Sequence, residues 1–242
     1  MSKSELHMHE IRNFIDDRYC YGNNIDPRFY RYKGVQNAFL VGNAVDHAIK
    51  AHYTGGDMYA DDFRKLKTKI NQIEAQSTVE NYIEIYKEEY FHSWREVTLK
   101  IPLRKYTIIA RPDLMALTYF QNETVIVEIK TAAEGTNPGE ALDFQTMLYC
   151  WASYRWNFKI PIGVIKRTLM KTRIKRKKAE SENEYIERLA CSYGPKQLKS
   201  VFRPVNIDMI YEFEKYLKAI LIEMDKAKKY NYYKKSTDYW GI

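Results

Sequence analysis

The sequence of 242 residues predicts an α/β protein in which a helical N-terminal part precedes a core of strands and helices. Before about residue 93, apolar residues recur at the spacing of an amphipathic helix. After that point, short runs alternate between apolar and polar residues or are wholly apolar, as in strands. The last long run, residues 207–229, returns to helical spacing.

The N-terminal part is expected to contain a helix at residues 4–19, a loop at 26–33, a helix at 38–52 and a long charged helix at 59–90. Gly55 and Gly56 end the second helix, because glycine is typical of helix C-termini. Residues 76–78 are a candidate break in the third helix.

Three strands are expected next, at residues 94–102, 106–110 and 125–129. In the first, Val97, Leu99 and Ile101 alternate with polar residues, the pattern of a half-buried strand. Polar turns at 104–105 and 121–123 separate the strands. We therefore expect the strands to pair in order as a meander, with the apolar third strand at the centre.

The remaining expected elements are a loop at residues 136–139, a helix at 141–154, a strand at 162–169 and helices at 180–190 and 207–229. Without internal repeats or Gly/Ser-rich linkers, a single domain over residues 1–242 is the default. It would comprise a mostly helical part, an α/β core and a basic, helical C-terminal part, at residues 1–93, 94–170 and 171–242.

The net charge of +8 favours a polyanionic partner. Basic residues gather in residues 171–178 and again in 226–235, where tyrosines lie between them. The chain has 21 tyrosines in all, and aromatic rings can stack on nucleic-acid bases. Two solvated faces would explain the basic runs equally well.

The three cysteines, Cys20, Cys150 and Cys191, are too far apart in the sequence for a zinc knuckle. So sparse a set is typical of a reducing compartment. Residues 1–11 lack the apolar core of a signal peptide, and no apolar run is long enough to span a bilayer. We expect a soluble, cytoplasmic protein with no membrane partner.

The chemistry is expected at the ends of two strands. Asp113 follows the strand at 106–110, and Glu128 and Lys130 end the strand at 125–129. Glu128 and Lys130 are two residues apart, so their side chains share one face of a strand. Two carboxylates, with the carbonyl of Ile129, could hold a divalent metal ion, and Lys130 could orient the attacking water and stabilise charge on a phosphate.

Glu-x-Lys at a strand end is weak evidence by itself, because strand ends are often charged. Here Pro112 and Asp113 precede it, and Gln145 and Tyr149 follow on the next expected helix, four apart and so on one face. This pattern resembles the PD-(D/E)XK nuclease superfamily and, through its Gln-x-x-x-Tyr pair, the RecB-like branch. The resemblance implies a restriction-endonuclease-like core, a central mixed β-sheet flanked by helices, with an N-terminal helical extension.

In that branch an N-terminal helix carries Gly-x-x-x-His, whose histidine binds metal. This chain has Gly42, with Asp46 in the histidine's place and His47 one position later. The resemblance therefore implies Asp46 as the third metal ligand, with His47 as the substitute. Both would otherwise be helix-surface residues.

Some RecB-type members hold an iron–sulfur cluster through one N-terminal and three C-terminal cysteines. Cys20 stands where the first would be, but residues 233–242 contain no cysteine. We therefore expect no cluster, and Cys150 is expected to be a core residue.

The resemblance implies a DNA nuclease that uses Mg²⁺ or Mn²⁺, with Asp113, Glu128 and Lys130 as catalytic residues. Exonuclease action on DNA ends in recombination, repair or replication is favoured, together with a recombination or replication protein as partner and a phage or mobile-element origin. The expected DNA contacts are Arg111, Thr131, Gln145 and Tyr149. The alternatives are a structure-selective endonuclease and a catalytically silent nucleic-acid-binding protein of the same fold. Oligomeric state stays open.

Overall fold

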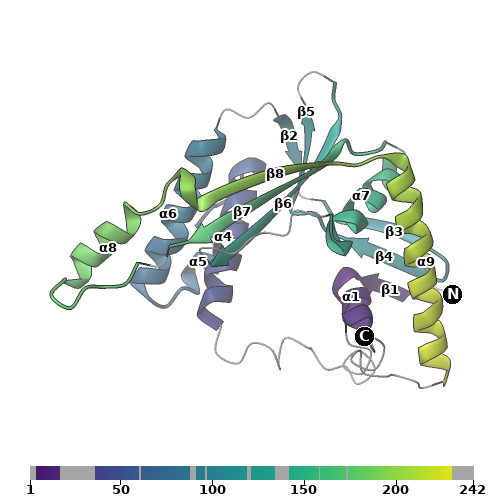
Figure 1. Ribbon diagram of the computed structural model, residues 1–242, viewed down its shortest axis with the longest axis horizontal. Coiled ribbons are helices and arrows are strands. Elements are labelled where there is room, and N and C mark those ends of the chain that lie inside the picture. Colours follow the sequence, from purple (N-terminus) through teal and green to yellow (C-terminus); the bar gives the residue numbers. More distant parts are fainter. Residues whose placement is uncertain are drawn as a thin grey trace, which may run out of the picture.

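The computed structural model describes residues 4–16, 36–59, 61–87, 91–95, 97–118, 121–133, 142–157, 159–172 and 174–230. The loops expected at 26–33 and 136–139, Cys20 and the tail beyond residue 230 lie outside these ranges. The chain forms an α/β structure with two sheets and helices around them (Figure 1).

The larger sheet has the strand order β2-β5-β6-β7-β8 and is mixed. Its strands are β2 (Phe91–Arg95), β5 (Leu114–Thr118), β6 (Thr124–Ala133), β7 (Gly163–Lys171) and β8 (Leu198–Pro204). Strands β6 and β7 run parallel, while β5 on one side and β8 on the other are antiparallel to them. A parallel pair needs a crossover connection, and the helix α7 (Phe144–Asn157) lies in the segment that makes it.

The smaller sheet has the order β1-β4-β3. Its strands are β1 (Ser4–His7), β3 (Leu99–Leu103) and β4 (Tyr106–Ala110). The turn expected at residues 104–105 joins β3 to β4, and Arg104 takes a positive φ of 55° there.

Besides α7, the described residues form the α-helices α1 (Met8–Asp16), α4 (Gln36–Thr54), α5 (Asp61–Arg64), α6 (Lys69–Tyr86), α8 (Glu182–Ala190) and α9 (Ile207–Tyr230). Helices α4 and α6 cover one face of the larger sheet, and α7 covers the other. The smaller sheet, α1 and α9 pack around α7.

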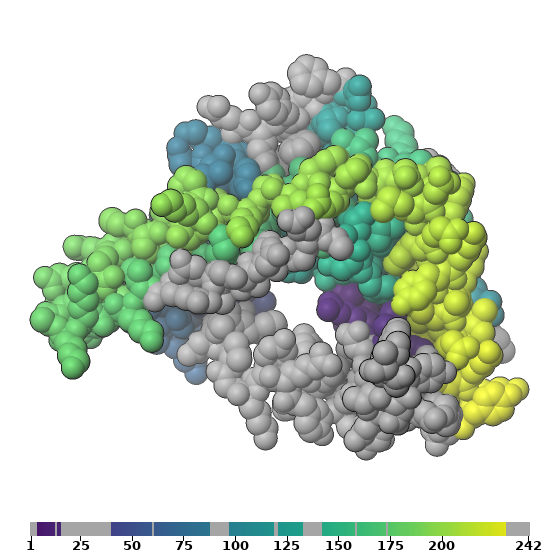
Figure 2. Space-filling view, viewed as in Figure 1, coloured from purple at the N-terminus to yellow at the C-terminus, as the bar shows by residue number. Residues whose placement is uncertain are grey.

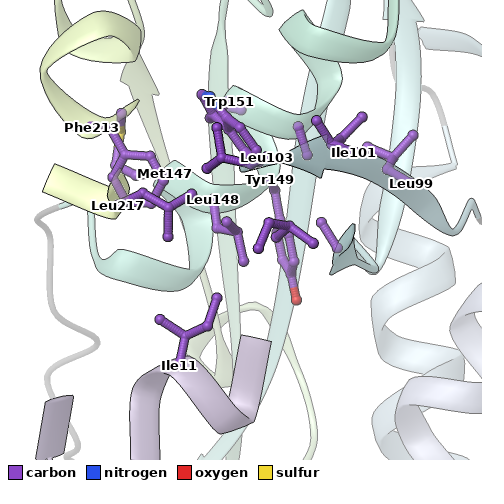
Figure 3. Close-up of a cluster of buried hydrophobic side chains, with 14 of the residues drawn as sticks. Ile11, Leu99, Ile101, Leu103, Met147, Leu148, Tyr149, Trp151, Phe213 and Leu217 are labelled. Carbon is purple, nitrogen blue, oxygen red and sulfur yellow. The ribbon is translucent and has the colours of Figure 1, made fainter. Parts of the chain in front are cut away.

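Strand β6 is buried on both faces, which explains its apolar sequence. Val125, Val127 and Ile129 point into the core beneath α4 and α6, while Ile126 points into the core around α7. Figure 3 shows the second core, where Trp151 and its neighbours on α7 pack against side chains of β3, α1 and α9. Glu128 is two residues after Ile126, so its side chain lies on the same face of β6, the face that α7 covers.

The fold class is as predicted, and the strand expected at 125–129 is central in its sheet, but the expected meander is wrong. Strand β4 pairs with β3 and β1 and belongs to the smaller sheet. The partner of β6 is β5, a strand that the sequence analysis missed between Asp113 and the turn at 121–123. Asp113 and Glu128 still lie near each other because Asp113 immediately precedes β5.

Three other expectations need correction. Residues 4–7 form β1 and not the start of a helix, and the segment around residues 76–78 lies unbroken inside α6. The helical break falls earlier, where the Thr68 side chain accepts a hydrogen bond from the backbone of Asn71 and caps α6. The single strand expected at 94–102 is wrong, because its residues fall in the end of β2 and in β3, which belong to different sheets; β8 was not predicted.

Between β7 and β8 the chain forms an arm, residues 174–197, that carries α8. In Figures 1 and 2 this arm projects from the body of the molecule, on the left of each view. Ser181 and Glu184 form a reciprocal capping box that fixes the start of α8. Among the helices the structure describes, none combines the length and apolar character that crossing a bilayer requires.

Candidate active site

Asp113 is held at the start of β5 by the backbone of the neighbouring strand. Its Oδ2 accepts a hydrogen bond of 2.8 Å from the backbone N–H of Ile129, and the residue is 9% exposed. The pairing of Leu114 with Val127 sets this register. The carboxylate of Asp113 is therefore fixed beside β6, next to Ile129, which precedes Lys130 in the sequence.

Glu128 is 3% exposed, and one of its carboxylate oxygens receives two partners. Lys130 Nζ forms an ion pair with Glu128 Oε1, and Gln145 Nε2 donates a hydrogen bond of 2.8 Å to the same atom. The Lys130 side chain is 56% exposed, so its ammonium lies between the buried carboxylate and the surface. The two-residue spacing on β6 brings Glu128 and Lys130 together as predicted.

Gln145 joins Glu128 to Tyr149. Its Nε2 also contacts the hydroxyl of Tyr149 at 2.8 Å. The ring of Tyr149 lies among the apolar residues of the core, and Figure 3 shows its hydroxyl at the outer end. Tyr149 is only 4% exposed, and in this structure its hydroxyl holds the side chain of Gln145 in place. Contact of Gln145 or Tyr149 with DNA stays a prediction.

The first turn of α7 is anchored to β7. The side chain of Asp143 accepts a hydrogen bond of 2.9 Å from the backbone of Thr146, and the hydroxyl of Thr146 accepts one of 3.0 Å from the backbone of Asp143. Lys166, whose register partner is Glu128, contacts Asp143 at 3.0 Å. The pair fixes the helix start, and with it the position of Gln145.

Helix α4 brings Asp46 and Lys50, one turn apart, to the same place. Lys50 Nζ lies 2.8 Å from Asp46 Oδ2 and 3.1 Å from Asp113 Oδ1. His47 points elsewhere, with its Nδ1 3.7 Å from Asp62 Oδ2 on α5. The structure thus gathers Asp46 with Asp113, while His47 contacts Asp62; Asp46 and His47 both line one cavity.

The close approach of α4 to β6 depends on Gly42. A Cβ atom at this position would lie 2.8 Å from Thr131 Oγ1. Thr131 is half-buried and packs against α4 at Gly42. Its expected contact with DNA stays a prediction. Arg111 is exposed on the segment between β4 and β5.

Burial and like charge set the electrostatics of the cluster. Burial, with the charge of Asp113, raises the pKa of Glu128 from its ordinary value to about 8. Burial and Asp113 likewise raise the pKa of Asp46. For Lys50 and Lys130, burial is outweighed by the surrounding carboxylates, and their pKa values are raised, so both remain charged.

Within the described ranges, no three His, Cys, Asp or Glu side chains converge as a ready metal-binding group. The donor chemistry nevertheless fits a hard divalent cation. Two carboxylate oxygens, Asp46 Oδ1 and Glu128 Oε2, are buried without a hydrogen-bond partner. Buried polar atoms normally have a partner, so these two oxygens mark an unmet need for positive charge or a donor.

The sequence analysis missed Lys50, Asp143 and Lys166. Lys50 had one available signal, its place one turn after Asp46 on an expected helix. Asp143 precedes the first helical residues of α7 with Thr146 three positions later, which is a helix-cap spacing. Lys166 lies beside Glu128 because β6 and β7 pair in a particular register, which the spacing of residues in the sequence does not reveal.

The model of the PD-(D/E)XK nuclease superfamily matches residues 28–233, which is most of the chain. The protein belongs to this superfamily and is a nuclease by family. No curated protein matches its sequence.

A solved structure supports the same fold. It is a candidate exonuclease from Eubacterium rectale with 16% sequence identity and a TM-score of 0.51, and the match covers 91% of this chain and 81% of that one. The structure of SSO0001 has 11% identity over 79% of this chain and 88% of its own, with a TM-score of 0.34, too low to carry an argument.

The contact between Gly42 and Thr131 predicts a coupled effect on stability. Replacing glycine by alanine inside a helix normally stabilises by about 1 kcal/mol. We expect Gly42→Ala to lose most of this gain, because the new Cβ meets Thr131 Oγ1. In a Thr131→Ala background the gain should reappear. Urea denaturation of the four proteins measures the coupling, and equal gains in both backgrounds would show that α4 and β6 do not approach this closely.

The raised pKa of Glu128 predicts a pH dependence in the presence of a chelator. The folded protein binds the Glu128 proton more tightly than the unfolded chain does, so stability falls as pH rises from about 4.5 to about 8. Glu128→Gln should remove much of this slope and be the more stable protein at pH 8. Thermal melting in chelator between pH 5 and 8.5 tests this. A wild-type slope that Glu128→Gln leaves unchanged would contradict it.

Proposed function

We propose that this protein is a Mg²⁺- or Mn²⁺-dependent deoxyribonuclease of the RecB-like branch that degrades DNA from its ends. The observation that carries the proposal is the convergence of Asp113, Glu128 and Lys130 on two paired strands, with buried carboxylate oxygens that lack partners. Family membership supports the nuclease activity; metal dependence and action on ends are the proposal.

The proposed metal ligands are the carboxylates of Asp113, Glu128 and Asp46, with the carbonyl of Ile129. Asp46 is preferred to His47 because it shares Lys50 with Asp113, whereas His47 contacts Asp62. A divalent cation held there supplies an activated water and neutralises charge on the scissile phosphate.

The protein groups around the metal site have separate tasks in this proposal. Lys130 remains protonated and stands at the exposed edge of the cluster, where it can donate to a water or to a phosphate oxygen. Gln145 fixes the carboxylate of Glu128, and Tyr149 fixes Gln145. The Gln-x-x-x-Tyr pair therefore orients a carboxylate, which is the feature that supports the RecB-like assignment.

Action on DNA ends, in recombination, repair or replication, is the finer part of the proposal. It rests on the RecB-like motif and on the likeness to the Eubacterium rectale protein described as a candidate exonuclease. The rival is a structure-selective endonuclease with the same site. Covalently closed circular DNA separates the two, because an exonuclease leaves it intact while it degrades the linear form.

The arm supplies a candidate DNA-backbone contact. Glu180 is used inside the arm: it pairs with Arg188, while its backbone carbonyl accepts a hydrogen bond from Arg176. The loop is thereby held in shape while the side chains of Lys175, Lys177 and Lys178 are exposed. Exposed lysines on a fixed loop suit the sequence-independent binding of phosphates.

The site assignment predicts the outcome of a digestion assay. With end-labelled linear DNA, wild type should cut with Mg²⁺ or Mn²⁺ and not with chelator. Lys130→Ala should lower the rate by roughly 100-fold or more, as removal of one electrostatic group that stabilises a transition state does. Lys100→Ala is the control, because Lys100 pairs with Glu5 on the smaller sheet. A fully active Lys130→Ala protein, or cutting in chelator, would refute the proposed chemistry.

The arm assignment predicts a change in salt dependence. Changing Lys175, Lys177 and Lys178 together to Gln should weaken DNA binding and reduce the slope of log affinity against log salt by roughly 2 to 3, about 0.9 for each duplex phosphate that is no longer neutralised. The matched control changes Lys87, Lys215 and Lys218, which lie outside both basic runs and pair with neighbouring glutamates. Fluorescence anisotropy measures both, and equal slopes in the two triple variants would exclude the arm as a specific contact.

A further inference from the structure

The most unusual group in the carboxylate cluster is Lys50. Its ammonium bridges Asp46 and Asp113, which come from α4 and from the start of β5. The Lys50 side chain is 16% exposed, so this bridge is largely withdrawn from water. The other oxygen of Asp113 already accepts the N–H of Ile129. Lys50 therefore takes up the oxygens of Asp46 and Asp113 that face each other.

A lysine four residues after an aspartate on an exposed helix face is normally a weak surface pair. The contact to Asp113 on a second element separates Lys50 from that case. Two carboxylates that share a partly dry site repel each other, and an unpaired buried charge is strongly destabilising. The Lys50 ammonium is the cation that compensates Asp46 and Asp113 in this structure.

A divalent metal ion would need the same two carboxylates. Both oxygens of Asp113 are already engaged, one by the backbone N–H of Ile129 and the other by Lys50. Mg²⁺ binds carboxylate oxygens at about 2.0–2.1 Å, a tighter fit than any ammonium contact. A dication bound by Asp46 and Asp113 would share these carboxylates with the Lys50 ammonium, and like charges at short range repel strongly. Lys50 and the metal ion are therefore mutually exclusive occupants of this position.

The structure also offers Lys50 another position. Asp46, His47, Lys50, Asp57 and Asp62 line an open cavity of about 290 Å³. Asp57 and Asp62 are carboxylates that could receive the ammonium if it left Asp113. A lysine side chain has enough rotatable bonds to swing between two such positions.

We propose that Lys50 is a built-in counter-ion that holds the metal-free site together and competes with the divalent metal for Asp46 and Asp113. The inference rests on the proposed function, since it presumes that a metal binds there. In this account Lys50 lowers metal affinity and sets the metal concentration at which the site fills.

The test measures Mn²⁺ binding by the full chain. Electron paramagnetic resonance reports free Mn²⁺, and calorimetry gives the affinity independently. Lys50→Met removes the charge and keeps the length of the side chain, and we expect it to bind Mn²⁺ about tenfold or more tightly than wild type. Lys215→Met is the matched control, because Lys215 is an exposed lysine on α9 that pairs with Glu212, away from the carboxylate cluster. It should bind Mn²⁺ as wild type does.

Thermal melting gives a second readout that does not depend on activity. In chelator, Lys50→Met should melt below wild type, because Asp46 and Asp113 lose their counter-ion, and Mn²⁺ should raise its melting temperature more. If Lys50→Met does not fold in chelator, Lys50→Arg replaces it. That variant keeps the charge, so its Mn²⁺ affinity should be no higher than wild type, and a clearly higher affinity would overturn the proposal.

The outcomes distinguish a failure of the competition from a failure of the metal site. If wild type binds Mn²⁺ and Lys50→Met binds it no more tightly, the competition is refuted while the proposed metal site stands. If neither protein binds Mn²⁺ at millimolar concentration, the proposed metal chemistry itself fails, and the role of Lys50 fails with it.

Discussion

The constraint on which the rest of the site depends is the burial of like charges beside a central strand. Strand β6 is covered on both faces, yet Glu128 occupies one of its inward positions, with Asp113 held against the backbone of Ile129. Taking carboxylates out of water costs several kcal/mol each unless cations or donors compensate them. Lys130, Gln145 and Lys50 supply that compensation in this structure. A divalent cation at this position would compensate the same buried carboxylates. The electrostatics that govern the stability of the fold therefore also govern the proposed metal binding.

The fold meets this demand by bringing three segments, distant in sequence, to one strand. Hydrogen bonding between β5 and β6 fixes Asp113, the approach of α4 permitted by Gly42 places Asp46 and Lys50, and the anchor of Asp143 to Lys166 places Gln145. These supports are a backbone pairing, a packing contact and a side-chain ion pair, and all three come from residues outside the Glu-x-Lys triplet. The motif residues could not converge without them, which explains why a short Glu-x-Lys triplet is weak evidence until its surroundings are known.

Prediction from sequence succeeded where the information is local. The two-residue period of a strand placed Glu128 with Lys130, and the four-residue period of a helix placed Gln145 with Tyr149. It failed where pairing is a tertiary choice: β4 was assigned to the wrong sheet because β5 was not recognised, although Asp113 still reached Glu128. Strand β8 was missed because its Lys, Arg and Pro residues resemble a loop, and such residues are tolerated on an edge strand. Lys50 was missed because a lysine on a helix is usually solvated, and only the position of Asp113 reveals its second partner.

The central claim is that Asp46, Asp113 and Glu128 form one metal site in which Lys50 takes the place of the cation when metal is absent. A crystal structure with Mn²⁺, located by its anomalous scattering, tests this most directly. We predict a Mn²⁺ ion in contact with the carboxylates of Asp113 and Glu128, and a Lys50 side chain turned away from Asp113. A Mn²⁺ ion bound elsewhere, with the ammonium of Lys50 still between Asp46 and Asp113, would contradict it.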